Sequence, residues 1–160
     1  MEESLREEGT ERFFADILEG FSLKAADPGT YSPLVLAWIG DGIYELIIRS
    51  ILIAGGNMSV DRLNRMGSRM AKAAAQAGIY ISIREELTEE EEAVFRRGRN
   101  AKSYSMAKNA SVNEYRHATG LEALCGFLYL NGKTERLLAL LRLGFERSGM
   151  LEPGGNDGIS

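Results

Sequence analysis

Three charged residues lie four apart inside a strongly apolar stretch. Residues 34–56 read LVLAWIGDGIYELIIRSILIAGG, with Asp41, Glu45 and Arg49 among them. A spacing of four places all three on one face of a helix. An intrahelical ion pair explains Glu45 and Arg49, but Asp41 lies between two glycines, which allow backbone or a ligand to approach closely. Asp41 is therefore a candidate functional acid.

A second acid occurs in the segment TGLEALCGFLYL, where Glu122 has no base within one helical turn. A carboxylate among small and apolar residues costs free energy unless it is paired. Two interpretations follow from the residues. Either a base on another helix, such as Arg49, pairs with Glu122, or Glu122 and Asp41 converge on a divalent cation. Two carboxylates suit Mg²⁺, which keeps several of its waters.

The net charge of −4 conceals two basic segments. Residues 1–30 hold eight acids and three bases, whereas residues 96–116 hold six bases and one acid. Residues 62–72 add four bases, three or four apart, with no acid among them. Local charge decides what a surface attracts, so these segments indicate a polyanion, although an ordinary solvated loop also explains residues 98–102. The candidate phosphate contacts are Arg62, Arg65, Arg69, Lys72, Arg97, Arg99, Asn100, Lys102 and Lys108.

Length and composition indicate one globular domain. The chain has 160 residues, of which 44% are hydrophobic and 26% charged. One cysteine and one histidine exclude an intrachain disulfide and a Cys/His zinc site. The acidic N-terminus is no signal peptide, and three charges near the middle of the apolar run argue against a membrane span. A cytoplasmic protein with no membrane partner is expected.

The elements that must position the two acids are all predicted to be helical. Apolar periodicity and capping residues predict helices over about 10–19, 33–54, 59–83, 88–97, 111–130 and 134–148, with a polar basic loop over 99–110. The segment 79–83 is the one candidate strand, and it continues a helix. The prediction is an all-α fold of six or seven helices. It comprises an acidic N-terminal extension with a short helix (1–30), one domain (31–150) and a disordered tail (151–160).

Three motifs resemble the ribonuclease III family. IGDGIYE resembles its signature helix, TGLEALCGFLYL resembles its second catalytic helix, and EEEEAVFRRGRNAKS between them resembles the Mini-ribonuclease III group, which lacks a double-stranded-RNA-binding domain. The resemblance covers roughly residues 33–143. It implies an all-α endonuclease domain, a two-fold homodimer, and Mg²⁺-dependent hydrolysis of double-stranded RNA to 5′-phosphate and 3′-hydroxyl ends.

The resemblance also implies roles for single residues. Asp41 and Glu122 match the family's catalytic metal ligands, and Glu45 matches a glutamate that supports these ligands or contacts the second subunit. Two positions depart from the broad pattern, because Ala37 and Thr119 stand where full-length ribonuclease III has further acids. Thr119 could hold a metal-bound water through its hydroxyl. These departures leave open how many metal ions bind.

Trp38, beside the signature acid, has two interpretations. It packs into the core of its own chain, or, as the resemblance implies, into the other subunit of a dimer. The resemblance further implies large-subunit (23S) ribosomal RNA precursor as the substrate, which leaves room for a ribosomal protein as a partner. The rival hypotheses are a non-catalytic RNA-binding or ribosome-associated module, which Ala37 and Thr119 favour, and a purely structural helical dimer.

Overall fold

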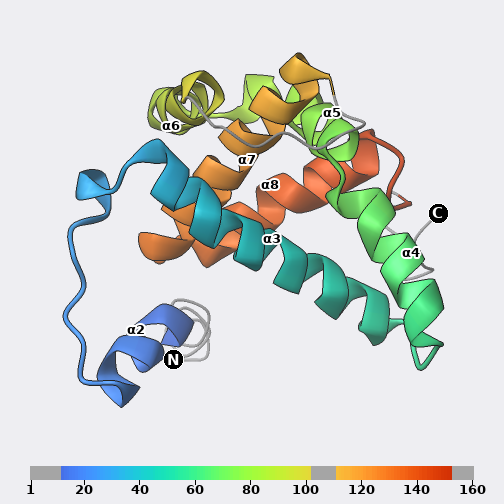
Figure 1. The fold of residues 1–160 in the computed structure, drawn as a ribbon, viewed down its shortest axis with the longest axis horizontal. Coiled ribbons are helices and arrows are strands. Elements are labelled where there is room, and N and C mark those ends of the chain that lie inside the picture. Colours follow the sequence, from blue (N-terminus) through green and yellow to red (C-terminus); the bar gives the residue numbers. More distant parts are fainter. Residues whose placement is uncertain (1–11, 102–110, 153–160) are drawn as a thin grey trace, which may run out of the picture.

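A computed structural model describes residues 12–101 and 111–152 of the chain (Figure 1). This part contains seven α-helices, two short 3₁₀ helices and no β-strand, so the all-α prediction is confirmed. The helices are α2 (Arg12–Gly20), α3 (Pro33–Ala54), α4 (Val60–Ala71), α5 (Ala73–Ile83), α6 (Glu89–Asn100), α7 (Val112–Leu130) and α8 (Thr134–Arg147), and the 3₁₀ helices are η1 (Pro28–Thr30) and η2 (Arg84–Glu86).

The helices begin where the sequence provides capping residues. Ser32 and Ser59 accept hydrogen bonds from backbone N–H groups in the first turns of α3 and α4, and Pro33 opens α3, where its missing N–H costs nothing. Thr88 with Glu91 and Ser111 with Glu114 form capping boxes at the starts of α6 and α7, two of the helices predicted from capping residues. These local signals fix the starts of four helices.

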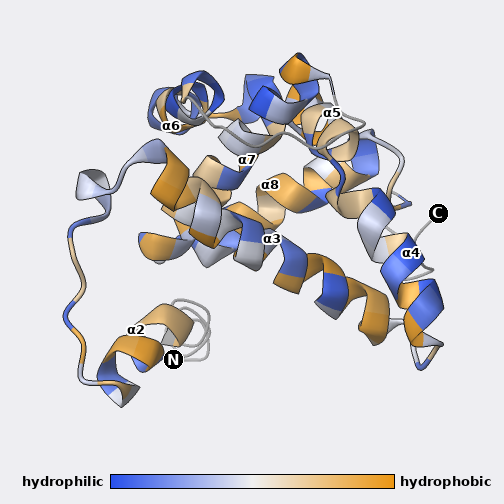
Figure 2. Ribbon diagram, viewed as in Figure 1, coloured by the Kyte–Doolittle hydropathy of each residue, from blue (hydrophilic) through white to orange (hydrophobic). Residues whose placement is uncertain are grey.

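Helices α3 and α7 cross at the centre of the fold, with α5 and α8 on one side and α6 against α7 (Figure 1). The main core contains buried residues of α3, α4, α5, α7 and α8, among them Tyr44, Ile48, Leu124 and Phe145. Figure 2 shows α3 as predominantly hydrophobic, with hydrophilic residues concentrated on α4 and α6. Among the described residues, no helix has both the length and the apolar character that crossing a membrane requires.

The single helix predicted over 59–83 is wrong, because the chain turns at Lys72. Lys72 has extended backbone angles (φ −66°, ψ 154°) and separates α4 from α5. In a continuous helix, the Met70 carbonyl would accept the N–H of the residue four positions later. It accepts the hydroxyl of Tyr44 instead, at 2.6 Å. This long-range bond gives the freed carbonyl a buried partner and ties the turn to the middle of α3.

The predicted helix over about 88–97, which would end before Gly98, is too short, because α6 continues to Asn100. A Cβ atom at position 98 would lie 2.8 Å from the Ala123 Cβ and 3.0 Å from the Gly120 Cα. Gly98 therefore serves the close packing of α6 on α7 and does not terminate the helix. The basic loop predicted over 99–110 loses its first residues to α6, and residues 102–110 lie outside the described part of the chain.

Helix α2 contacts the rest of the fold through an aromatic pair. The rings of Phe14 and Tyr129 lie 5.4 Å apart, which places α2 beside the C-terminal end of α7. At the other end of the chain, Leu151 packs against the main core, and its N–H donates to the Phe145 carbonyl at 3.1 Å. The described part of the predicted 151–160 tail therefore begins on the core surface, and residues 153–160 are not described.

A charged pair joins the start of α6 to α8. Arg136 donates to both carboxylate oxygens of the buried Glu91, at 2.8 and 2.9 Å, and to the Glu86 carbonyl at 2.7 Å. The Arg136 hydrogen bonds keep the pKa of Glu91 below its ordinary value, although burial acts in the opposite direction. A two-pronged arginine–carboxylate contact of this kind is directional and strong.

We expect Arg136→Ala to lower the free energy of unfolding by about 2–4 kcal/mol at pH 7, because it leaves the Glu91 carboxylate buried without its cation. A depressed carboxylate pKa gives stability that is present above the ordinary pKa of 4.5 and is lost as the pH falls through the folded-state pKa. Urea unfolding from pH 7 to pH 3 should therefore show the wild type and the variant converging in acid. Arg142→Ala, which breaks the exposed Arg142–Glu146 pair, is the control and should cost less than about 0.5 kcal/mol. Equal losses in the two variants at pH 7 would contradict the prediction.

Candidate functional site

The crossing of α3 and α7 depends on two glycines that face each other's backbone. A Cβ atom at Gly40 would lie 1.7 Å from the Glu122 carbonyl oxygen, and one at Gly126 would lie 2.0 Å from the Leu36 carbonyl oxygen. No larger residue fits at either position while the helices keep this distance. Gly42 differs, because nothing lies within 4 Å of its added Cβ. Of the two glycines beside Asp41, Gly40 therefore allows the backbones of α3 and α7 to approach closely, whereas Gly42 faces open space.

This close crossing brings the side chains of Asp41 and Glu122 together. Burial is the largest cause that raises the pKa of Glu122, and the charge of Asp41, a hydrogen bond with Asp41 and the charge of Glu45 add to it. Together they raise that pKa from the ordinary 4.5 to about 8. At neutral pH the Glu122 carboxyl therefore keeps its proton, because burial and the neighbouring acids disfavour its negative charge. The structure thus joins two of the acids singled out in the sequence.

Arg49 does not pair with Glu122, although the sequence left that partner open. Its guanidinium donates to Glu45 Oε2 at 3.1 Å, so the intrahelical ion pair predicted from the spacing of four is confirmed. The groups that act electrostatically on Glu122 are the acids Asp41 and Glu45, together with burial. Glu122 is therefore a half-buried acid that has acids as its charged neighbours.

The two positions that lack an acid lie close to the pair. Ala37 is buried one turn before Asp41 on α3, and it packs with Val94 and Ala123 in a small second core cluster. Thr119 is buried one turn before Glu122 on α7, and its hydroxyl donates to the Tyr115 carbonyl at 3.1 Å. Since that donor is already used, the Thr119 hydroxyl can only accept a hydrogen bond from a water at this site.

The four bases predicted on one face of α4 gather around one cavity. This cavity, of about 580 Å³, lies between α4 and the end of α8 and has no acid among its lining residues, which include Arg62, Arg65, Arg69 and Lys72. All four side chains are exposed. Helical spacing of three and four therefore produces a cationic face here, as the sequence indicated.

The other predicted phosphate contacts belong to the end of α6. Arg97 and Asn100 are exposed in the last turn, and the Arg99 guanidinium donates to Asn100 Oδ1 at 3.3 Å. Lys102 and Lys108 lie outside the described residues. Because α4 and α6 lie at opposite ends of the molecule in Figure 1, the two basic groups form separate surfaces within one chain.

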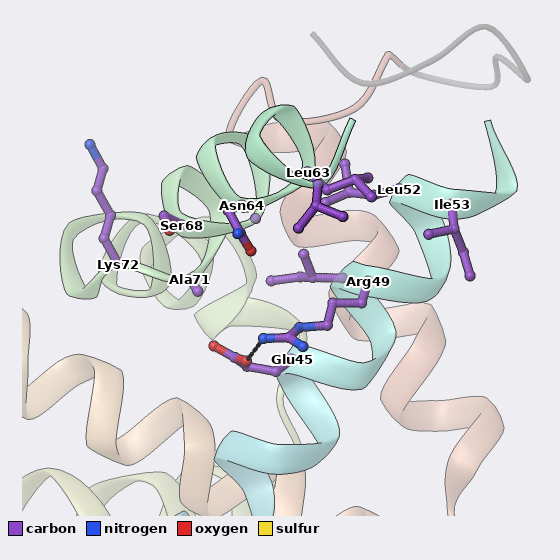
Figure 3. A pocket seen from close by; sticks show the side chains of 12 residues that line it. Glu45, Arg49, Leu52, Ile53, Leu63, Asn64, Ser68, Ala71 and Lys72 are labelled. Carbon is purple, nitrogen blue, oxygen red and sulfur yellow. Dashed lines mark hydrogen bonds and ion pairs between the residues drawn. The ribbon is translucent and has the colours of Figure 1, made fainter. Parts of the chain in front are cut away.

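A second cavity, of about 450 Å³, lies between α3 and α4, and the sequence did not reveal it (Figure 3). Its apolar lining includes Ile48, Leu52 and Leu63, and its polar lining includes the Glu45–Arg49 pair, Asn64, Ser68 and Lys72. The available signal was a second set of α4 residues four apart, opposite the basic face. Residues 60, 64 and 68 and residues 63, 67 and 71 form two such rows.

Trp38 does not belong to the core of its own chain, since 78% of its surface is exposed. It shares the outer face of α3 with three further exposed apolar side chains, Val35, Leu46 and Ile53. Core packing, one of the two interpretations from the sequence, is therefore wrong for this chain. A row of exposed apolar residues of this kind marks a contact surface.

The Asp41–Glu122 pair has the chemistry of a small divalent-cation site. Its donors are hard carboxylate oxygens, and a divalent cation that displaced the Glu122 proton would balance the charges of both carboxylates. One or two carboxylates are the protein contribution that Mg²⁺ commonly accepts. Within residues 12–101 and 111–152, no group of three or more His, Cys, Asp or Glu residues is arranged to hold a metal ion. Cys125 is a buried free thiol of α7, and burial raises its pKa.

Comparisons with known proteins agree with this arrangement. The Ribonuclease III domain family matches residues 34–133. Mini-ribonuclease 3 of Brevibacillus brevis is 46% identical over 119 residues, which cover 74% of this chain and 89% of that protein. Mini-ribonuclease 3 of Symbiobacterium thermophilum is 44% identical, covering 75% and 92% of the two chains. The crystal structure of protein FN1578 from Fusobacterium nucleatum superposes with a TM-score of 0.68 at 32% identity, covering 76% of this chain and 98% of that chain.

Proposed function

The chain belongs to the Mini-ribonuclease 3 group of the ribonuclease III family and is an endoribonuclease of that type, and from this premise we propose that it cleaves double-stranded RNA with Mg²⁺ held by Asp41 and Glu122. The observation that carries the proposal is the close crossing of helices α3 and α7 at Gly40, which brings the carboxyl groups of Asp41 and Glu122 together. The products would carry 5′-phosphate and 3′-hydroxyl ends.

The residues present fit a magnesium ion. Asp41 and Glu122 would hold it, and Glu45 would add negative charge from one turn along α3. Bound there, Mg²⁺ supplies positive charge to the scissile phosphate and makes a water more acidic. Thr119, whose hydroxyl is fixed by the Tyr115 carbonyl, would accept a hydrogen bond from a water and orient it.

Binding of the duplex would depend on the basic surfaces. The proposed phosphate contacts on α4 are Arg62, Arg65, Arg69 and Lys72, and those at the end of α6 and beyond are Arg97, Arg99, Asn100, Lys102 and Lys108. Double-stranded RNA is recognised by its A-form shape and through phosphate and 2′-hydroxyl contacts, because its major groove is too narrow for side chains to read. Two separated cationic surfaces suit a long, regularly charged ligand.

The proposed active form is a homodimer joined through the outer face of α3. Trp38 and its exposed apolar neighbours support this, since a face of this kind gains free energy when a second copy covers it. A dimer would bring two catalytic sites to one duplex, so that each strand could be cut.

We expect Trp38→Ala to convert the dimer to monomers, because it removes the largest exposed apolar side chain of α3. Sedimentation or light scattering over a range of protein concentrations would measure this. Arg142→Ala, on the exposed face of α8, serves as the control and should leave the mass unchanged. If the mass of Trp38→Ala were unchanged, the subunit contact would lie elsewhere. A monomeric wild type would contradict the proposed dimer.

The proposed substrate is the precursor of large-subunit (23S) ribosomal RNA, and the proposed location is the cytoplasm. A ribosomal protein bound to that RNA is a further proposed partner. These assignments rest on the resemblance to the family. Reactions with purified precursor RNA, with and without ribosomal proteins, would test them.

Cleavage of a purified duplex RNA by the wild type and by Asp41→Asn, with Mg²⁺ or with EDTA, tests the proposal. We expect cleavage in only one of the four reactions, that of the wild type with Mg²⁺. The Asp41→Asn variant loses one of the two metal ligands, and EDTA removes the ion. Binding of RNA without cleavage by the wild type would favour the non-catalytic RNA-binding module, the alternative that Ala37 and Thr119 support. Asp61→Asn, which changes an exposed acid in the first turn of α4, is the matched control.

A further inference from the structure

One buried amide lacks a hydrogen-bonding partner within the described part of the chain. The polar and charged side chains that are buried there are Gln76, Glu91 and Thr119. Glu91 is bonded by Arg136, and the Thr119 hydroxyl donates to the Tyr115 carbonyl. The Gln76 amide, in contrast, has no bond to another described residue, although only 3% of the surface of Gln76 is exposed. Burying an amide whose donors and acceptor stay unpaired costs free energy, so its expected partner is a small molecule such as water.

The amide of Gln76 lies at the bottom of a narrow opening. Glu92 Oε2 is the one side-chain oxygen or nitrogen among the described residues that is fully enclosed and also lacks a hydrogen bond. The Gln76 amide lacks a bond as well but is not fully enclosed, so the small exposed fraction of this residue belongs to its polar end. The opening therefore admits a water, whereas the backbone of an RNA strand is too large to reach the amide.

The Gln76 side chain lies on the buried face of α5, which packs on α7. Ile79, Tyr80 and Ile83, three, four and seven positions after Gln76, are buried as well. These spacings place all four side chains on one face of the helix. Within the described part of the chain, α5 contacts α7 more extensively than it contacts any other helix. Gln76 is therefore directed toward α7, the helix that carries Glu122.

The part of α5 that follows Gln76 meets the first half of α7. One turn after Gln76, the ring of Tyr80 lies 5.4 Å from the ring of His117. His117 precedes Glu122 by five residues, which corresponds to about 7.5 Å along a helix. This contact sets one limit on the level at which Gln76 meets α7.

The chain that precedes α5 meets a later part of α7. Met70, six residues before Gln76, accepts the hydroxyl of Tyr44. Burial is the largest cause that raises the pKa of Tyr44, and the charges of Cys125 and Glu122 add to it, so Tyr44 lies beside these two residues. Helices α5 and α7 therefore run in opposite directions, and Gln76 lies between the two contacts at about the level of Glu122.

We propose that Gln76 is a positioning residue of the candidate metal site and that its amide holds the Glu122 carboxylate in place through one water molecule. The inference rests on the proposed function. Gln76 is not among the groups that bond Glu122 directly, and a water fits the narrow opening. Such a water can also donate to the Tyr44 hydroxyl, whose own proton is bonded to the Met70 carbonyl. Hydrogen bonds to a carboxylate that binds a metal ion fix its orientation and raise its affinity for the ion.

Gln76→Met tests the proposal, because methionine has nearly the same volume, favours a helix and has no amide. In EDTA, the midpoint of thermal unfolding should be unchanged or higher by up to about 5 °C, since the variant no longer buries an unpaired amide. Calorimetric titration of the metal-free protein should show Mg²⁺ binding that is about tenfold weaker than in the wild type. Ile81→Met places the same residue on the exposed face of α5 and should match the wild type in both measurements.

Cleavage of duplex RNA gives a second readout. At a Mg²⁺ concentration equal to the wild-type dissociation constant, the kcat of Gln76→Met should be about fivefold lower, and about tenfold more Mg²⁺ should restore about half of the maximum. The KM for RNA should change less than about twofold, because the buried amide does not contact the duplex.

Unchanged Mg²⁺ affinity in Gln76→Met would overturn the proposal, whatever the kcat. A midpoint in EDTA that is lower by more than about 5 °C would also overturn it, because the amide would then be bonded within the protein. A wild type that neither binds Mg²⁺ nor cuts RNA would instead contradict the proposed function, and this inference with it.

Discussion

Replacing Gly40 by alanine should lower the free energy of unfolding by about 4 kcal/mol or more. The added Cβ would lie 1.7 Å from the Glu122 carbonyl oxygen, which belongs to a helix backbone and cannot rotate away. Helices α3 and α7 would have to separate, although their contact is the most extensive in the described part of the fold. Thermal unfolding should show a midpoint lower by roughly 10 °C or more.

The same change should weaken the proposed active site, because separating α3 from α7 moves Asp41 away from Glu122. Any Gly40→Ala protein that remains folded at low temperature should therefore also lose Mg²⁺-dependent cleavage. Gly78→Ala is the control, since nothing lies within 4 Å of its added Cβ and alanine favours a helix by up to about 1 kcal/mol. A Gly40→Ala protein as stable as the control would show that the two helices are not held this closely.

Replacing Glu122 by glutamine should reduce RNA cleavage by at least about 10³-fold in kcat, because charge stabilisation of the transition state is lost with the ligand. The same change should stabilise the metal-free protein at alkaline pH. Glu122 has a folded-state pKa of about 8 against an ordinary 4.5, so the folded protein keeps a proton that the unfolded chain releases. A raised carboxyl pKa gives stability that is full below pH 4.5 and is lost as the pH rises to about 8.

Glutamine does not titrate, so the free energies of unfolding of the wild type and of Glu122→Gln should differ most at pH 8 and converge near pH 4. Since Glu122 is only half-buried, solvent screens its charge, and we expect the variant to gain roughly 2 kcal/mol at pH 8 without metal, or about 4–8 °C in the unfolding midpoint. Calorimetry in EDTA at the two pH values measures this. Added Mg²⁺ should raise the unfolding midpoint of the wild type and leave that of Glu122→Gln unchanged. Glu135→Gln, an exposed acid of α8, is the charge-matched control. Equal unfolding midpoints for the wild type and Glu122→Gln at pH 8 would contradict the raised pKa of Glu122.

The sequence by itself determined the class of fold, most helix starts and the candidate acids. Capping residues act on the first turn that follows them, so Ser32, Ser59, Thr88 and Ser111 mark helix starts without tertiary information. Helical spacing likewise revealed the Glu45–Arg49 pair, because both partners belong to one turn of one helix. The shared motifs identified Asp41 and Glu122, since similarity of sequence needs no coordinates.

The tertiary structure alone decided where two helices end. The turn at Lys72 depends on the Tyr44 hydroxyl, which bonds to Met70 over a sequence separation of 26 residues. Gly98 remains inside α6 because the facing surface of α7 requires a residue without a side chain. In both cases, a long-range contact outweighs the local preference that a sequence pattern records.

The tertiary structure also decided the chemistry of the acids. The sequence contains Asp41 and Glu122 as two separate carboxylates, and only the glycine contact between α3 and α7 brings them close enough to raise the pKa of Glu122. The cavity between α3 and α4 likewise exists only because these two helices pack beside each other, and residues of both helices line it. Spacing along the chain determines which residues share one face of a helix, but the distance between faces of different helices depends on how the helices pack.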